Sequence, residues 1–149
     1  MSKWKVFVAL VLALGMAGVG SAAAQQKVTA QDYTEINQLY ARYNFAIDSG
    51  DAEGWADTFT PDGVFGGNTE GRAALVEFAQ NFHKGQNGAA RHWNTNLVVT
   101  PTAEGADGAC YLMLWNTSER PATIIVSAIY RDKLVKTSDG WRFKSRITE

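Results

Sequence analysis

One histidine and one aspartate are the residues of this sequence best suited to acid–base chemistry. His92 lies in the run Arg91–Val99, whose pattern predicts a β-strand, and Asp48 lies just before Gly50, where a helix is expected to end. A carboxylate in the last turn of a helix opposes the negative end of the helix dipole. Placed beside His92, Asp48 would hold the imidazole in one tautomer and stabilise its charged form. The alternative is a solvated turn residue without a chemical role.

Side chains alternate along a strand, so the run around His92 presents two faces. The polar face comprises His92, Asn94 and Asn96. The opposite face, which is predicted to pack in the core, comprises Trp93, Leu97 and Val99. The polar face could point to water or to a cavity. Because the next predicted strand, Gly108–Asn116, is apolar on both faces, the pattern favours a cavity.

Three aromatic residues are further candidates for this cavity. Tyr43 precedes Asp48 by five residues, which is about 140° around a helix, so the two share a pocket only if that pocket wraps around the helix end. The alternative is a core tyrosine on the apolar stripe of the helix. Trp115 and Tyr130, together with Asn96, are the candidates for contact with a ligand.

The composition argues against several other kinds of site. The single cysteine, Cys110, excludes an internal disulfide, and the two histidines lack the spacing of a metal motif, so no metal or other cofactor is predicted. A formal net charge of −1 argues against nucleic acid as the main partner. Basic residues at alternate positions near the C-terminus predict a solvated outer face. These residues are Arg131, Lys133, Arg142, Lys144 and Arg146.

Residues 1–24 are predicted to be a secretory signal peptide. Lys3 and Lys5 precede an apolar run, and small residues up to Ala24 complete the cleavage pattern. The run is shorter than the ~20 residues of a membrane span, although a retained anchor is the alternative. Cleavage would leave 12 basic and 15 acidic residues, a net charge of −3, and a secreted or periplasmic protein with no membrane partner.

Residues 25–149 are expected to form one domain that begins with three helices. The Thr29–Asp32 capping box and the apolar spacing that follows predict a helix ending at Gly50. Asp51 is expected to cap a short helix that carries Trp55 and Phe59, and the stripe in Arg72–His83 predicts a third helix.

After residue 90 the hydrophobic period becomes two, which is typical of strands. The predicted strands are Arg91–Thr100, Gly108–Asn116, Ala122–Lys136 and Trp141–Thr148, with a short strand at Val64–Phe65. Turns at Asp107–Gly108 and Asp139–Gly140 would join them into antiparallel hairpins. Helices first and strands after indicate an α+β domain, with the helices packed on one face of a curved, mixed or antiparallel sheet.

The run Tyr43–Asp51 and the following Phe59–Gly63 resemble the opening of SnoaL-like domains of the nuclear transport factor 2-like superfamily. The resemblance continues through His92, Asn96, Tyr130–Asp132 and Asp139–Phe143, and so spans nearly all of residues 29–146. It implies a cone-shaped α+β barrel, a homodimer or homotrimer, and a pocket for a small apolar or aromatic molecule. Scytalone dehydratase and bile acid 7-alpha-dehydratase are members of this superfamily. Asp48 and His92 of this chain match the residues that carry the elimination in both enzymes, and Tyr43 matches a helix tyrosine of the bile acid enzyme.

These observations predict a cofactor-independent lyase or isomerase. His92 would remove a proton from a carbon next to a carbonyl or hydroxyl group, Asp48 would orient the imidazole, and Tyr43 or Asn96 would bind the substrate oxygen. The alternative is a non-catalytic module of the same fold that holds a ligand or a partner subunit.

Overall fold

In the computed structural model, which describes residues 27–149, α1 (Ala30–Ser49) begins at the predicted capping box. The Thr29 side chain accepts a hydrogen bond from the Asp32 backbone N–H, and the Asp32 carboxylate accepts one from the Thr29 backbone N–H. The helix ends at Gly50, whose φ of 81° favours glycine, and a Cβ there would lie 2.9 Å from the His83 ring. The predicted signal peptide, residues 1–24, lies outside the described residues.

The second helix is shorter than predicted. Asp51 caps α2 (Ala52–Ala56), and the expectation that this helix carries Phe59 is wrong because β1 (Phe59–Phe65) begins there. Phe59 pairs in parallel with Phe143, whose backbone N–H donates to the carbonyl of Thr58. Pairing with the strand that contains Phe143, which is distant in the sequence, therefore makes the segment that begins at Phe59 a strand and not a helix.

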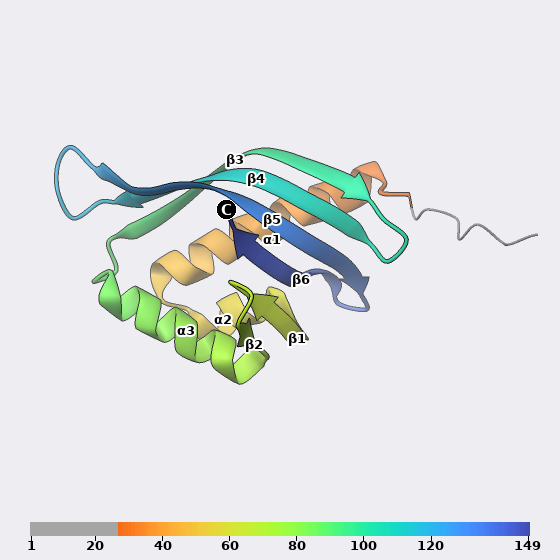
Figure 1. Cartoon of the computed structure of the whole chain (residues 1–149), viewed down its shortest axis with the longest axis horizontal. Helices are drawn as coiled ribbons and strands as arrows, with labels where there is room; N and C mark the ends of the chain where they lie inside the picture. The colour runs from red at the N-terminus through yellow and green to blue at the C-terminus, as the bar shows by residue number, and fades with distance from the viewer. Residues whose placement is uncertain (1–26) are drawn as a thin grey trace, which may run out of the picture.

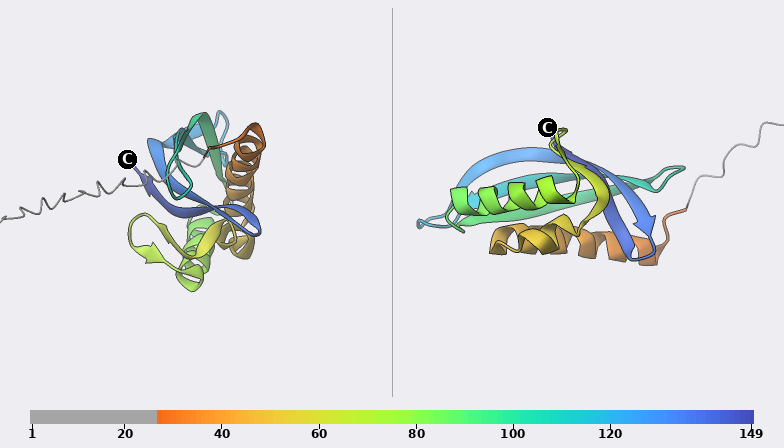
Figure 2. Two further views of the ribbon diagram at one scale, coloured as in Figure 1. Left: turned by 90° about the vertical axis from the view of Figure 1, so that its right-hand side faces the viewer. Right: turned by 90° about the horizontal axis from the view of Figure 1, so that it is seen from below.

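Of the remaining elements, β2 was not predicted and the others follow in the predicted order. These elements are β2 (Thr69–Glu70), α3 (Arg72–Gly85), β3 (Ala90–Pro101), β4 (Ala106–Asn116), β5 (Thr123–Thr137) and β6 (Gly140–Thr148). The strand order is β2-β1-β6-β5-β4-β3, with β1 and β6 parallel and the other neighbours antiparallel. Figures 1 and 2 show a strongly curved sheet with the helices on one side. The predicted α+β fold with a curved, mixed sheet is confirmed, and the sheet stays open between its edge strands β2 and β3.

One of the two predicted turns is wrong. Asp139–Gly140 does begin β6, with Gly140 at φ 97°, but the β3–β4 turn lies at residues 102–105 and Gly108 is inside β4. A Cβ on Gly108 would come within 2.3 Å of the Tyr40 hydroxyl. Gly108 is thus a point of close approach between the strand and α1, and a turn signal read from the sequence alone cannot separate these two uses of glycine.

Besides a register shift between Phe59 and Val64 of β1, three β-bulges in the antiparallel part of the sheet interrupt the alternation of inward and outward side chains. One lies between Thr95 and Val98 of β3, one between Leu114 and Trp115 of β4, and one where Lys133 and Leu134 meet β6. A bulge adds one residue to one strand, so side chains on its two sides follow opposite phases. The predicted core face of β3 is therefore wrong at Trp93, which is 56% exposed, whereas Leu97 and Val99 beyond the bulge do pack against the core.

A charged pair lies at the centre of the core. Arg146 has no exposed surface, so its predicted place on a solvated basic face is wrong. The Asp132 carboxylate accepts hydrogen bonds from Nε of Arg146 at 2.7 Å and Nη2 at 2.8 Å, and the Tyr40 hydroxyl donates to the same carboxylate. Burial lowers the pKa of Arg146, but the charge and hydrogen bonds of Asp132 outweigh it and raise that pKa well above its usual range.

The N-terminal end of α1 is held to the sheet by Asp32. Its Oδ1 accepts hydrogen bonds from Lys136 Nζ at 2.6 Å and Trp141 Nε1 at 3.0 Å. The bond from Lys136, together with those from Thr29 and Trp141, lowers the pKa of Asp32 far below its usual range. Within residues 27–149, no helix is long and apolar enough to cross a membrane.

We expect Asp32→Asn to lower the free energy of unfolding by about 1–3 kcal/mol near neutral pH, because it removes the charge from several hydrogen bonds. The folded-state pKa of Asp32 is depressed, so its stabilisation is complete above the usual aspartate pKa and is lost as the pH falls. Urea denaturation should show the variant approaching the wild type in acid. Asp107→Asn, which breaks an exposed pair with Lys133, is the control and should cost less than about 1 kcal/mol. If the difference in free energy of unfolding between wild type and Asp32→Asn does not become smaller in acid, the depressed pKa of Asp32 is contradicted.

Candidate active site

Asp48 and His92 meet where the end of α1 lies against the start of β3. The Asp48 carboxylate contacts His92 at two points. Its Oδ1 lies 2.6 Å from Nδ1 of the ring, and its Oδ2 accepts a hydrogen bond of 2.9 Å from the His92 backbone N–H. The His92 side chain is 6% exposed and that of Asp48 13%. A carboxylate next to Nδ1 favours the tautomer with hydrogen on that atom, which leaves Nε2 as the basic ring nitrogen.

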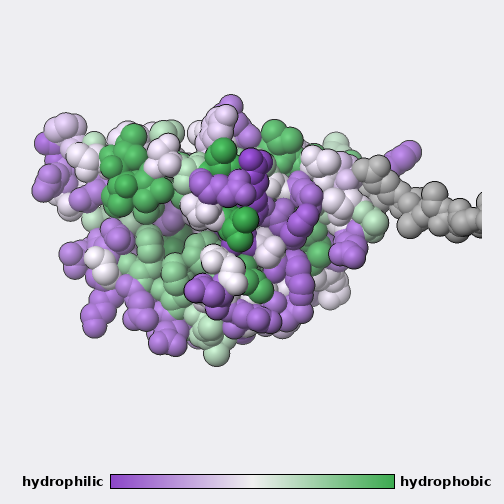
Figure 3. All heavy atoms as spheres, viewed as in Figure 1, coloured by the Kyte–Doolittle hydropathy of each residue, from purple (hydrophilic) through white to green (hydrophobic). Residues whose placement is uncertain are grey.

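A pocket of about 160 Å³ lies beside this pair, between α3 and the inner face of the sheet. His92, Tyr43 and Tyr130 all line it. The other lining side chains are almost entirely apolar: Ile47, Phe65, Phe78, Phe82, Leu112, Leu114, Val126 and Thr148. Figure 3 shows apolar residues gathered on the face between α3 and the overhanging sheet. The pocket is thus an apolar site with few polar groups, as is usual for small-molecule sites.

The two tyrosines connect the pocket to the buried arginine. The Tyr43 ring lies 6.3 Å from the His92 ring and 6.1 Å from the Tyr130 ring, centroid to centroid. The guanidinium carbon of Arg146 lies 4.3 Å from the Tyr43 ring centre and 4.1 Å from that of Tyr130. Burial raises the pKa of Tyr43, and the charge of Arg146 partly opposes this. Both tyrosines are therefore neutral hydrogen-bond donors at physiological pH.

Two predicted ligand contacts lie elsewhere. Asn96 sits in the β3 bulge at φ 59° and is exposed, so the prediction that it shares the face of His92 is wrong. Trp115 lies on the outer face of the sheet, where its ring is 5.1 Å from that of Trp93. The alternate side chains of β4, including Leu112 and Leu114, face the pocket instead. The structure therefore brings together Tyr43, Asp48, His92 and Tyr130, but neither Asn96 nor Trp115.

Residues that the sequence interpretation left out also shape the site. Phe78 and Phe82 of α3 form one wall, and the Phe82 ring lies 5.5 Å from that of His92. The apolar stripe of the predicted third helix contained this signal, because two bulky phenylalanines one turn apart can line a cavity as well as fill a core. Arg146 gave no such signal, since the bulge that turns it inward depends on strand pairing.

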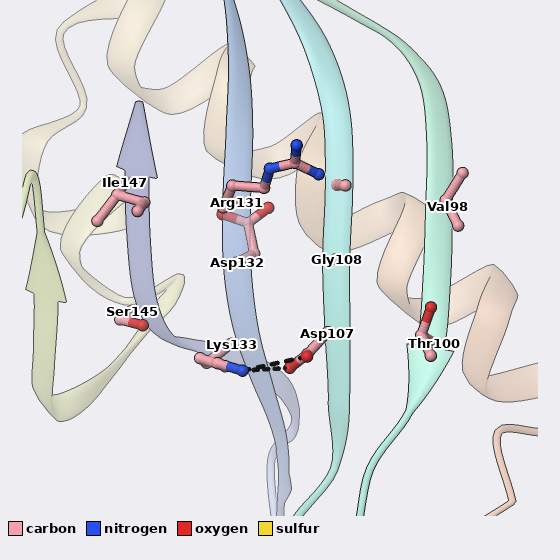
Figure 4. Close-up of a pocket in the computed structure, with 10 residues that line it drawn as sticks. Val98, Thr100, Asp107, Gly108, Arg131, Asp132, Lys133, Ser145 and Ile147 are labelled. Carbon is pink, nitrogen blue, oxygen red and sulfur yellow. Dashed lines mark hydrogen bonds and ion pairs between the residues drawn. The ribbon is translucent and has the colours of Figure 1, made fainter. Parts of the chain in front are cut away.

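A larger groove of about 500 Å³ lies on the opposite, outer face of the sheet (Figure 4). Val98 and Ile147 form its apolar part. Its charged side chains are paired with neighbours: Lys133 with Asp107, and Arg131 with Glu149. Neither His92 nor Asp48 lines this groove. Within residues 27–149, no three His, Cys, Asp or Glu side chains are grouped closely enough to hold a metal ion.

Comparison with known proteins adds a family and several similar structures. The profile of the SnoaL-like domain matches residues 28–147. An NTF2-like protein with a cystatin-like fold from Novosphingobium aromaticivorans is 26% identical, over 79% of this chain and 80% of that one, with a TM-score of 0.72. Aln2 from a Streptomyces species is 28% identical, over 83% and 94%, with a TM-score of 0.75.

A third similar structure contains a bound molecule. It is a Catenulispora acidiphila protein in complex with S-DNPA, 33% identical over 81% of this chain and 94% of that one, with a TM-score of 0.70. The search of proteins with curated descriptions gave no match.

Because Asn96 occupies the left-handed region, we expect its substitutions to follow backbone conformation and not pocket chemistry. Asn96→Val should lower the free energy of unfolding by about 1–2 kcal/mol, and Asn96→Gly should change it much less. Urea denaturation of both variants measures this difference. Equal free energies of unfolding for the two variants would contradict the left-handed backbone conformation of Asn96 in the bulge.

The double contact of Asp48 should fix the tautomer of His92. We expect ¹⁵N NMR of the ring to show hydrogen on Nδ1 in the wild type and a shift toward the Nε2–H form in Asp48→Ala. Asp51→Ala is the matched control, because Asp51 is a neighbouring carboxylate that caps α2 and does not contact His92. A ring spectrum that is the same in wild type and Asp48→Ala would show that the carboxylate does not set the tautomer.

Proposed function

This chain belongs to the SnoaL-like domain family, and on that premise we propose that it is a small-molecule enzyme, a cofactor-independent lyase or isomerase that uses Asp48 and His92 as its acid–base pair. The observation that carries the proposal is the 2.6 Å contact between the carboxylate and Nδ1 of the ring. It leaves the other ring nitrogen available on a side chain that lines an apolar pocket. A histidine base oriented by a carboxylate is a recurrent solution for proton transfer near neutral pH.

The proposed reaction begins with proton removal from a carbon next to a carbonyl group. Nε2 of His92 takes the proton, and the electron pair moves through the new carbon–carbon double bond onto the carbonyl oxygen. The Tyr43 hydroxyl donates a hydrogen bond to the resulting enolate. Asp48 stabilises the imidazolium that has formed.

The enolate then collapses in one of two ways. In an isomerisation, the imidazolium returns its proton to a different carbon of the conjugated system. In a dehydration, the carbonyl re-forms, a double bond forms to the neighbouring carbon, and the hydroxyl group there leaves as water with the proton from His92. Both routes restore neutral His92, and neither requires a cofactor.

The pocket supports a small, apolar or aromatic substrate. Phenylalanines from β1 and α3 and aliphatic side chains from α1, β4 and β5 form its apolar wall. Of the lining residues, His92, Tyr43, Tyr130 and Thr148 bring polar side-chain atoms to it. A volume of about 160 Å³ accommodates roughly one substituted ring without rearrangement. The S-DNPA complex of the Catenulispora relative is consistent with small-molecule binding in this family.

The proposal also includes where the protein works and how it assembles. The N-terminal pattern of a charged start, an apolar run and small residues supports export, so we place the protein outside the cytoplasm, secreted or periplasmic. A homodimer or homotrimer is supported by the outer sheet face, where Trp93, Val98, Tyr111 and Ile147 are 40–61% exposed.

We expect His92→Ala and Asp48→Asn each to reduce turnover by about 10²–10⁴-fold, the usual contribution of one acid–base group. Small aryl β-hydroxyketones are suitable probes, because dehydration gives a conjugated enone whose ultraviolet absorbance reports the rate. Asp51→Asn should retain wild-type turnover, since this carboxylate accepts a hydrogen bond from the Gly54 backbone N–H and does not line the pocket.

Unchanged turnover in both variants would contradict the assignment of the pair. If the probes bind but are never converted by the wild type, and binding is the same in His92→Ala and Asp48→Asn, the chain is the non-catalytic binding module instead.

A further inference from the structure

The hydroxyl of Thr148 on β6 is a polar group of the pocket that the proposed reaction does not use. Thr148 lines the cavity together with Tyr130, its partner on β5. The preceding residue, Ile147, lines the groove on the opposite face of the sheet, so alternation along β6 directs the Thr148 side chain toward the pocket. Within residues 27–149 this hydroxyl makes no hydrogen bond, which leaves it available to a ligand.

Thr148 and His92 occupy diagonally opposite corners of the sheet surface that lines the pocket. Strands β5 and β4 separate β6 from β3 in the sheet. Along the strands, His92 is level with Leu114 and, through it, with Val126, whereas Thr148 is level with Tyr130. A ligand that touches both His92 and Thr148 therefore has to extend across the whole pocket.

The corner at Thr148 is the open side of the pocket. The last pair between β6 and β5 involves Glu149, so residues 123–128 of β5 extend past β6. Two lining residues on this side, Val126 and Thr148, are exposed, whereas the side chain of His92 is 6% exposed. A ligand whose reacting carbon lies at His92 thus places its far end beside the threonine, close to solvent.

The charged side chains near this corner are already paired. On β6, Arg146 forms an ion pair with Asp132, and Glu149 forms one with Arg131. The threonine hydroxyl can donate one hydrogen bond and accept two, which suits a neutral hydroxyl group of a ligand. A carboxylate would fit poorly, because burial of an unpaired charge against an apolar wall is costly.

A structural role explains the shape of this side chain but not its hydroxyl. Threonine and valine are both branched at Cβ and both favour strands. Valine at position 148 would therefore serve the strand and the apolar wall equally well. The hydroxyl makes a difference only to a polar group that approaches from the pocket, where it replaces a hydrogen bond to water with one to the ligand.

We propose that Thr148 determines which ligands the pocket selects, by hydrogen bonding a neutral hydroxyl group at the end of the ligand remote from His92. The ligand class is a cyclic or aromatic carbonyl compound that carries its hydroxyl group across the ring from the carbonyl group. Thr148 contacts the ligand and takes no part in proton transfer. The inference rests on the proposed function in one respect, that the ligand lies in this pocket with its reacting end at His92, and it does not require turnover.

The experiment compares acetophenone with 4′-hydroxyacetophenone, which differ only in the hydroxyl group across the ring. Neither ketone has a hydroxyl group that can be eliminated, so only binding is measured. Isothermal titration calorimetry gives both dissociation constants at a pH below the ionisation of the phenol. Wild-type protein should bind the hydroxylated ketone about three- to tenfold more tightly, which is the gain expected from one hydrogen bond.

Four variants identify the source of this preference. Thr148→Val keeps the shape of the side chain without the hydroxyl, and it should bind both ketones with equal affinity. Thr148→Ser keeps a hydroxyl and should retain most of the preference. Thr123→Val is the matched control, because Thr123 is an exposed threonine of β5 that does not line the pocket. It should behave as the wild type, and His92→Ala should also retain the preference, since the ligand hydroxyl lies at the opposite corner.

The inference is overturned if neither ketone binds, if Thr148→Val keeps the full preference, or if Thr148→Ser loses it as completely as Thr148→Val. A preference that disappears in His92→Ala and survives in Thr148→Val would place the ligand hydroxyl at the wrong corner and would also overturn it. Turnover of the hydroxyketones is judged separately. A preference that depends on Thr148 without any turnover would leave this inference standing and remove the proposed reaction, and turnover with a preference unaffected by Thr148→Val would do the reverse.

Discussion

A guanidinium without access to water is the constraint around which the domain is arranged. Arg146 requires the Asp132 carboxylate beside it on the neighbouring strand, and that carboxylate also binds the hydroxyl of Tyr40 on α1. The hydroxyl reaches it because Gly108 has no side chain in the way. One charged pair thus fixes the distance between helix and sheet, since a buried charge is tolerated only when its partners are in place.

Carboxylates also determine how α1 lies across the sheet. Asp32 holds the start of the helix to Lys136 and Trp141, and Asp48 holds its end to His92. Hydrogen bonds to charged groups are stronger than neutral ones, so both ends of the helix are held firmly. Tyr43 lies between these attachments and is thereby placed against the pocket, where its ring meets that of His92 edge to face. A site held in this way needs little rearrangement when a ligand binds.

The pocket lies next to the aromatic side chains that surround Arg146. Helix α3 closes an apolar wall over one end of the cavity, where phenylalanines exclude water. Exclusion of water strengthens every electrostatic interaction at the other end, because the effective dielectric constant falls. Tyr43 and Tyr130 belong to both regions, since each lines the pocket and each ring packs against the Arg146 guanidinium.

The sequence by itself determined most of the elements and indicated the contact between Asp48 and His92. Caps and apolar spacing located α1, period-two runs located the four long strands, and the helix-end position of Asp48 indicated its contact with His92. These are local signals, read within a few residues. Only the tertiary structure decided which way side chains point beyond each bulge, and so moved Asn96 out of the pocket and Arg146 into the core. A bulge forms where the partner strand demands an extra residue, and alternation along one strand contains no information about its partner.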